Sequence, residues 1–398
     1  MKPVYVIDVV RTPVGKYGGA LSSIRPDDLL AHAIVALLQR HDTIDVNAIG
    51  DVIAGAANQA GEDNRNVARM AALLAGLPVT VPGSTVNRLC ASGLQAVMDG
   101  SRQIMCGDAQ LVVACGVESM TRAPFVMAKP ATPFSRNVEV YDTTMGWRFI
   151  NKKLAAAYHP YSMGETAENV AKQWKISREE QDMFALQSQE KYFAAKAAKK
   201  WDDEMVVVEF NKDGLISWMV EDEHPRQTSI EKLAALKPAF VKDGTVTAGN
   251  SSGINDGAAA MLLAGEEAVQ AFGLKPMARI VSMAVAGVDP AIMGMGPVPA
   301  TRKALERAGL KLEDIGLVEL NEAFASQSIA CIKELGMNPE IVNVNGGSIA
   351  IGHPLGCSGV RISATLLHEM QRSKPKYGLA AMCIGVGQGA AVIFEGLD

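Results

Sequence analysis

Three thiol or imidazole side chains in glycine-rich surroundings carry the clearest chemistry of this sequence. Cys90 lies in VNRLCASGLQ, His353 in GGSIAIGHPLG and Cys383 in MCIGVGQG. A cysteine thiolate is a strong nucleophile, and a nearby imidazole can take up the thiol proton at neutral pH. Glycine lets the backbone approach a ligand closely. Together these residue types predict covalent catalysis with acid–base assistance, provided that the fold brings them to one place.

Each of these residues also has a structural interpretation, which for His353 is a turn histidine that makes a structural hydrogen bond. A free cysteine is among the most buried residue types, and the stretch around Cys90 taken alone favours a core residue. Its position just before a helical run would lower the pKa of its thiol. Cys383 fits the end of a packed strand, or a second acid/base with the Gly385 N–H as an oxyanion donor. Asn321, after the strand-like GLVEL, fits a loop cap or a residue that orients the imidazole.

The remaining cysteines give weaker signals. The six cysteines form no CxxC pair and no zinc-type spacing, which favours reduced thiols in a cytoplasm over a disulfide framework. We expect Cys106, Cys115 and Cys331 to be structural. Cys357, four residues after His353, remains open between the two roles.

The composition is that of an ordinary globular protein. The chain has 398 residues, of which 48% are hydrophobic and 20% charged, with a net charge of −5. This charge argues against nucleic acid or an anionic membrane as the main partner. The N-terminus lacks the pattern of a signal peptide, and no window approaches about 18 apolar residues free of charge. We therefore expect a cytoplasmic protein.

Short apolar runs alternate with segments of helical periodicity, which predicts an α/β architecture. The expected strands are 4–10, 51–55, 110–117, 316–320 and 378–386, and the clearest helices are 26–41 and 299–309.

Two pairs of segments repeat at one offset. IDVNAIGDVI resembles LKLEDIGLVEL, which places Gly50 on Gly316, and ASGLQAVMDG resembles CSGVRISATL, which places Gly93 on Gly359. Both offsets are 266 residues (316 − 50 and 359 − 93). The repeat predicts two similar halves. We assign residues 1–120 with 247–270 to the first half, 271–398 to the second, and 121–246 to an inserted loop domain that forms a lid or substrate-binding region.

The motifs NRLCASG, NEAFA, GGSIAIGHPLGCSG and CIGVGQG, in this order and spacing, resemble those of the thiolase family, and the resemblance covers essentially the whole chain. It implies a five-layered αβαβα sandwich of two mixed sheets around buried helices. It implies an acyltransferase that cleaves a 3-oxoacyl-CoA with CoA to acetyl-CoA and a shortened acyl-CoA. Cys90 would be the nucleophile, His353 its base and Cys383 the second acid/base.

The resemblance also implies binding sites around these residues. One oxyanion hole would combine His353 with a water held by Asn321, and the other the N–H groups of Cys90 and Gly385. Coenzyme A and acyl-CoA would be substrates, with no bound metal or permanent cofactor, and the chain would form a homodimer or homotetramer. The positions that match a coenzyme A tunnel are Ser252, Met163, Phe240 and Phe324, with Arg226 near the adenine.

Within the family, the insertion resembles the thiolases of aromatic-compound breakdown, which cleave 3-oxoadipyl-CoA. Ser162 stands where acetoacetyl-CoA thiolases commonly have His, and Gly164 where the 3-oxoadipyl group usually has Pro. Arg148 in GWRF is a candidate cation for the far end of a dicarboxylate chain, or a structural arginine. Acetoacetyl-CoA and fatty-acid 3-ketoacyl-CoA thiolases are the alternative subtypes.

Two other classes share this fold. Ketosynthases pair their nucleophilic cysteine with two histidines, or with His and Asn, so Cys383 favours a thiolase. A non-catalytic lipid carrier would not need Cys90, His353 and Cys383 together.

Overall fold

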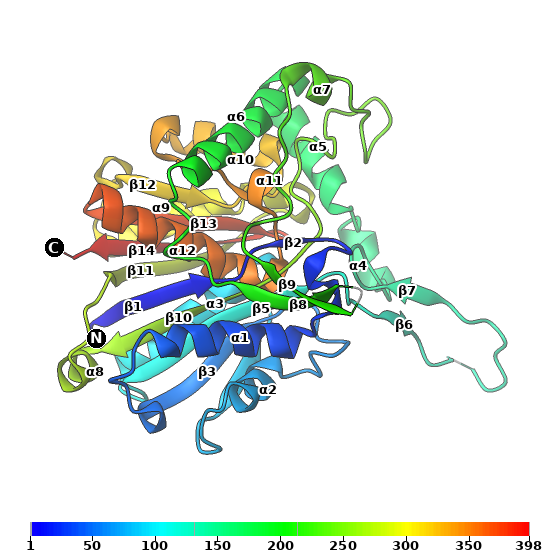
Figure 1. The fold of residues 1–398 in the computed structure, drawn as a ribbon. Coiled ribbons are helices and arrows are strands. Elements are labelled where there is room, and N and C mark those ends of the chain that lie inside the picture. The colour runs from blue at the N-terminus through cyan, green and yellow to red at the C-terminus, as the bar shows by residue number, and fades with distance from the viewer. Residues whose placement is uncertain (1, 131, 213, 398) are drawn as a thin grey trace.

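The computed structural model describes residues 2–130, 132–212 and 214–397 (Figure 1). Its centre is a ten-stranded mixed sheet with the strand order β12-β13-β14-β11-β1-β10-β5-β3-β4, and β2 pairs with β10. All five stretches expected to be strands lie in this sheet. The strand expected over 378–386 ends two residues earlier, at Ile384. The strands are β1 (Val4–Arg11), β2 (Gly15–Lys16), β3 (Ile49–Gly55), β4 (Gly83–Val86), β5 (Leu111–Ser119), β10 (Asn255–Gly265), β11 (Ala278–Gly287), β12 (Leu317–Leu320), β13 (Tyr377–Ile384) and β14 (Gln388–Gly396).

The sheet consists of two parts that meet at β1 and β11. Only the pairs Tyr5–Arg279 and Val6–Ala278 connect these two antiparallel strands. These two parts form the two sheet layers that the family resemblance implied, and the short ladder between the ends of β1 and β11 joins them edge to edge.

Helices complete five layers, as the resemblance implied. The first outer layer is α1 (Pro26–Gln39) and α2 (Val67–Leu74), the central layer is α3 (Ser92–Cys106) and α12 (Leu355–Ser373), and the second outer layer is α9 (Pro297–Ala308) and α10 (Ala325–Leu335). One hydrophobic core lies under each outer layer, and a third core surrounds α3 and α12 and includes strands of both parts of the sheet. Figure 1 shows α1 and α2 on the opposite side of the molecule from α9 and α10.

The two central helices approach each other through the glycines that the repeat aligned. A Cβ on Gly359 would lie 2.0 Å from the Leu94 nitrogen, and one on Gly93 would lie 2.7 Å from the Gly356 oxygen. No side chain fits at such distances, so both positions need glycine. The same offset of 266 relates the first residues of β5 and β13 (377 − 111), which extends the repeat to the sheet.

The segment between β5 and β10 carries small elements of its own. They are β6 (Phe125–Met127), β7 (Val140–Asp142), α4 (Lys152–Ala157), α5 (Met163–Gln173), α6 (Arg178–Ala197), β8 (Val208–Lys212), β9 (Leu215–Met219) and α7 (Ile230–Ala234). The β6–β7 hairpin projects away from the body of the molecule (Figure 1). The chain then enters β10, which lies between β1 and β5. Within the described residues, no helix has the length and apolar character needed to cross a membrane.

Candidate active site

A cavity of about 610 Å³ brings together the three reactive residues that the sequence singled out. Cys90, His353 and Cys383 all line it, although they come from three distant segments. Cys90 precedes α3, His353 precedes α12, and Cys383 is next to the last residue of β13. The two central helices therefore position the thiol and the imidazole, and the sheet positions the second thiol.

Cys90 lies in a single 3₁₀ turn, Leu89–Ala91, directly before α3. Burial raises the pKa of its thiol, while hydrogen bonds from the backbone N–H groups of Gly385 and Cys90 act in the opposite direction. The sequence predicted a lowered pKa from the position before a helix, and this prediction is wrong. The reason is that loss of hydration disfavours the thiolate more than the nearby N–H groups favour it. Cys90 therefore rests as a neutral thiol.

Strained backbone flanks the two N–H groups that point at the Cys90 sulfur. Leu89 has a φ of 47° and Val386 a φ of 62°, and the left-handed region is unfavourable for a β-branched residue such as valine. Gly387 follows Val386, and a Cβ at this position would lie 2.3 Å from the Val288 backbone oxygen, so no side chain fits there. Such strain persists only where the surrounding structure enforces it, commonly at functional sites. Here it aims two donors at one point, which is the arrangement that an oxyanion hole requires.

The hydrogen bonds of His353 define its tautomer. Its Nδ1 lies 2.6 Å from the Ser358 Oγ, and the Ser358 hydroxyl donates to the Pro354 carbonyl at 2.8 Å. Because a serine has only one hydroxyl proton, the ring must donate Nδ1–H to Ser358. Nε2 is then left with its lone pair. Burial, with a contribution from the positive charge of Arg361, lowers the pKa of His353 to about 3, so the imidazole is neutral at physiological pH.

A second chain of hydrogen bonds reaches His353 from the other side. The Arg361 guanidinium donates to the Ser348 Oγ at 2.5 Å, and the Ser348 hydroxyl donates to the Asn321 Oδ1 at 2.6 Å. The Asn321 amide group must therefore turn its NH₂ toward the His353 Nε2, at 3.4 Å. The contacts on both sides of the ring therefore make Nε2 a hydrogen-bond acceptor. A base that takes up a thiol proton must have such an acceptor.

Cys383 is almost completely buried, with 1% of its surface exposed. Burial raises the pKa of its thiol well above the usual range, and the neighbouring Cys90 adds to this effect. Two neighbouring thiols do not readily ionise together, since each negative charge opposes the other. Once it is acylated, the Cys90 sulfur can no longer become negative, so it no longer opposes ionisation of Cys383. The arrangement suits an acid that later acts as a base.

Four of the five residues expected to bind coenzyme A line the same cavity, namely Ser252, Met163, Phe240 and Phe324. The rings of Phe240 and Phe324 meet edge to face, with their centroids 6.1 Å apart.

Gly164 makes room for this aromatic pair, because a Cβ there would lie 2.0 Å from the Phe240 ring. Arg226 is outside the lining of the cavity, and its guanidinium donates to the Ala248 carbonyl at 2.9 Å.

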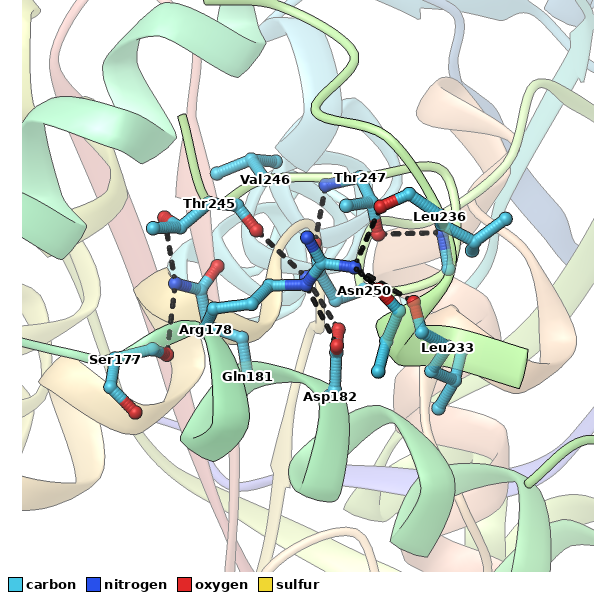
Figure 2. Close-up of polar contacts among 12 residues, drawn as sticks. Ser177, Arg178, Gln181, Asp182, Leu233, Leu236, Thr245, Val246, Thr247 and Asn250 are labelled. Atoms are coloured by element: carbon cyan, nitrogen blue, oxygen red, sulfur yellow. Dashed lines mark hydrogen bonds and ion pairs between the residues drawn. The ribbon is translucent and has the colours of Figure 1, made fainter. Parts of the chain in front are cut away.

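A polar network fixes the segment that leads to Ser252 (Figure 2). Arg178, the first residue of α6, donates to Asp182 at 2.7 Å and to the Leu233 carbonyl at 2.7 Å. Asp182 also accepts from the Asn250 side chain at 3.0 Å. Because Asn250 lies two residues before Ser252, this network ties α6 and α7 to the wall of the cavity.

Models of two protein domains match nearly the whole chain. The thiolase N-terminal domain matches residues 4–267, and the thiolase C-terminal domain matches residues 274–396. The chain belongs to the thiolase family. It is an acyltransferase of the thiolase type.

Named relatives agree with this assignment. The chain is 54% identical over 399 residues to the 3-oxoadipyl-CoA/3-oxo-5,6-dehydrosuberyl-CoA thiolase of Escherichia coli (strain K12), covering 99% of this chain and 100% of that one. It is 52% identical to the beta-ketoadipyl-CoA thiolase of Pseudomonas aeruginosa, with 99% of each chain covered.

Solved structures support the same assignment. The acetyl-CoA acetyltransferase of Bacillus anthracis has a TM-score of 0.94 and 42% identity, covering 100% of this chain and 99% of that one. The human mitochondrial 3-ketoacyl-CoA thiolase in complex with CoA has a TM-score of 0.92 and 42% identity, covering 100% of this chain and 98% of that one.

Sequence inspection missed the residues of this thiolase that orient His353. Ser358 and Ser348 carry no signal in the sequence, because serine is common in glycine-rich turns. Arg361 does stand out, as a charged residue within the apolar pattern of α12, and it is fully buried. Cys357, left open above, is buried in the core between α3 and α12 and is not part of the cavity lining.

We expect Ser358→Ala to lower kcat by roughly 10-fold or more, within the 10²–10⁴-fold that a general base contributes. Without its acceptor, Nδ1 no longer holds the ring proton, and the tautomer with Nε2–H cannot take the proton of Cys90. The measurement is steady-state thiolysis together with the rate of Cys90 alkylation by iodoacetamide. KM should change little.

Ser363→Ala is the matched control, because the Ser363 hydroxyl donates to the Gly359 carbonyl within the same helix, away from His353. An equal loss in both variants would mean that Ser358 only stabilises α12.

Proposed function

We propose that this thiolase cleaves 3-oxoadipyl-CoA with CoA, giving succinyl-CoA and acetyl-CoA. The observation that carries the chemistry is that Cys90, a neutral His353 with a bare Nε2, and Cys383 line one cavity. The identity of the acyl chain rests on the relatives, since proteins 51–54% identical over the full length bear the names of 3-oxoadipyl-CoA or beta-ketoadipyl-CoA thiolases.

The first half-reaction breaks the carbon–carbon bond. As the Cys90 sulfur attacks the 3-oxo carbon, the His353 Nε2 takes the thiol proton, and the N–H groups of Cys90 and Gly385 stabilise the resulting oxyanion. The oxyanion collapses, the bond to the acetyl-CoA unit breaks, and an enolate leaves. His353, now carrying Nε2–H, and Asn321 stabilise the enolate oxygen. Cys383 protonates the enolate carbon, so acetyl-CoA departs and an acyl-cysteine remains.

The second half-reaction transfers the acyl group to CoA. The Cys383 thiolate takes the proton of the incoming CoA thiol, whose sulfur attacks the acyl-cysteine carbonyl. Cys90 leaves as a thiolate and recovers its proton from His353. Each group thereby regains its starting protonation state: His353 returns a proton to Cys90, and the proton that Cys383 gave to acetyl-CoA is replaced by the proton of CoA. Cys383 acts as an acid in the first half and as a base in the second. The high pKa of Cys383 suits this order, because the resting enzyme needs it protonated.

The test is CoA-dependent thiolysis by the purified protein of 3-oxoadipyl-CoA, acetoacetyl-CoA and a medium-chain 3-oxoacyl-CoA. A clear preference for 3-oxoadipyl-CoA supports the proposal. A preference for acetoacetyl-CoA or for the longer chain keeps the mechanism and replaces the substrate. No turnover of any of them would overturn both.

We further propose that the chain forms a homo-oligomer through the β6–β7 hairpin. Apolar side chains on a projecting arm usually mark a contact with another protein surface. We expect sedimentation to give a mass above that of one chain, and the double variant Phe125→Ser, Phe134→Ser to give a smaller species with thiolysis retained. An unchanged mass would place the contact elsewhere. The exposed apolar residues of the arm are Phe125, Met127, Phe134, Val138 and Val140.

Two broader assignments complete the proposal. The six free cysteines fit a reducing compartment, so we place the enzyme in the cytoplasm.

We divide the chain into an N-terminal half (1–120 and 247–270), an inserted domain that binds coenzyme A (121–246) and a C-terminal half (271–398). The position of β10 between β1 and β5 supports joining 247–270 to the first half.

A further inference from the structure

Besides the two reactive thiols and the Tyr161 phenol, which can carry only negative charge, the lining of the cavity contains three ionisable side chains, Glu118, His353 and Arg148. His353 is neutral, for the reasons given above. Glu118 is buried and accepts the N–H groups of Ala57, Asn58 and Gly356, so it serves to tie three backbone segments together. Among the described lining residues, Arg148 is therefore the side chain that brings a permanent positive charge into the cavity.

No described protein group neutralises Arg148. Within residues 2–130, 132–212 and 214–397 its guanidinium takes part in no ion pair and no hydrogen bond, although the side chain is half-buried. Its backbone is held in place, because the adjacent Trp147 donates its indole N–H to the Tyr161 carbonyl at 2.9 Å. The Arg148 nitrogens are not among the buried side-chain atoms that lack a partner, so solvent reaches them, and an anion in the cavity can take the place of that water.

Other donors near Arg148 in the sequence are already used. The Thr143 hydroxyl donates to the Pro124 carbonyl at 2.6 Å, and the Thr144 hydroxyl to the Met120 carbonyl at 3.4 Å. The adjoining wall is largely apolar and includes Met145 and Met163. An anion that enters this part of the cavity thus finds one strong partner in surroundings that weaken competition from water.

We infer that Arg148 binds the distal carboxylate of the acyl chain and so makes the enzyme selective for dicarboxylic 3-oxoacyl-CoA substrates. This inference rests on the proposed function and names the residue that would carry its specificity. A guanidinium pairs with a carboxylate through two parallel hydrogen bonds, a geometry that a methyl end cannot reproduce. A site built to bind a polar group rejects the analogue that lacks it, because its own polar group is left unpaired.

A phosphate of coenzyme A presents the same anionic chemistry, and the choice of substrates separates the two sources. 3-Oxohexanoyl-CoA has the same number of acyl carbons as 3-oxoadipyl-CoA and ends in a methyl group. Both carry the same coenzyme A. An arginine that binds the carboxylate affects only 3-oxoadipyl-CoA, whereas one that binds a phosphate affects both substrates equally.

The experiment compares kcat/KM for these two substrates in the wild type and in Arg148→Gln. We expect the wild type to prefer 3-oxoadipyl-CoA, and the variant to lose roughly 10- to 100-fold on that substrate, the range of hydrogen bonds to charged groups. The rate with 3-oxohexanoyl-CoA should stay within about 3-fold, which also demonstrates that the variant is folded. Arg148→Lys, which keeps the charge without the planar fork, should fall between the two.

Arg102→Gln is the matched control, because it removes the same charge from an exposed ion pair with Asp99 outside the cavity lining. It should leave both rates unchanged. An equal loss on both substrates in Arg148→Gln, or a preference that survives the substitution, would overturn the inference and leave the proposed function standing. A wild type that turns over 3-oxohexanoyl-CoA as well as 3-oxoadipyl-CoA would overturn the proposed function as well.

Discussion

Cys90→Ala is expected to abolish thiolysis of every 3-oxoacyl-CoA while the protein stays folded. The substitution removes the atom that would form the acyl intermediate in the proposed mechanism, and the loss of a nucleophile costs roughly 10⁴-fold or more. The fold should tolerate it, because Cys90 is only partly buried and its side chain faces a cavity. The measurements are steady-state thiolysis and the intact mass after rapid quenching. The wild type should carry an acyl group, and the variant none.

Cys357→Ala is the control for this experiment. Its side chain is buried in the central core away from the cavity, so the variant should lose some stability and keep its turnover. Residual thiolysis by Cys90→Ala above about 1% of the wild-type rate would contradict a covalent intermediate on Cys90, since uncatalysed background is far lower.

Cys383→Ala should lower thiolysis by roughly 10²- to 10⁴-fold, the range of a general acid or base. In the proposed mechanism the neutral thiol supplies the proton that the acetyl-CoA enolate needs, and its thiolate then takes the proton of CoA. Alanine can do neither. Alkylation of Cys90 by iodoacetamide needs only Cys90 and His353, so its rate should be largely retained. The combination of lost turnover and retained alkylation separates the second acid/base from a merely structural residue.

Cys331→Ala provides the comparison for Cys383. Cys331 is likewise a buried thiol, its pKa raised by burial to about 12, and it lies in α10 outside the cavity lining. The Cys331→Ala variant should therefore retain its turnover. If Cys383→Ala kept more than about 10% of the wild-type rate, the proton would have to come from another group, and the proposed role of Cys383 would fail.

The sequence alone was enough for features that depend on neighbouring residues. Strand and helix periodicity is local, so the strands from 4–10 to 378–386 could be predicted within a few residues. The repeat was also readable, because the close approach of α3 and α12 demands glycine at Gly93 and Gly359 in both copies. The motifs around Cys90, His353 and Cys383 were sufficient to identify the family.

The roles of the cysteines needed the tertiary structure. Cys357 and Cys383 both lie in apolar stretches, yet one faces the core between two helices and the other faces the cavity. The direction in which a side chain faces depends on how its element packs against the rest of the fold. The pKa of Cys90 was mispredicted for the same reason, since the burial that raises it comes from segments far away in the chain.

The electrostatics of the site were likewise decided only by long-range contacts. Whether His353 is a base depends on which ring nitrogen bears the proton, and its partners Ser358 and Asn321 are assembled by folding. The sequence offered both Arg148 and Arg226 as cations for a ligand, but only Arg148 lines the cavity, where no other described residue pairs with it, and Arg226 lies outside with a backbone partner. Residue type and local pattern therefore predicted the chemistry of the site. Burial and hydrogen bonding are properties of the folded chain, and they determined how each group can act.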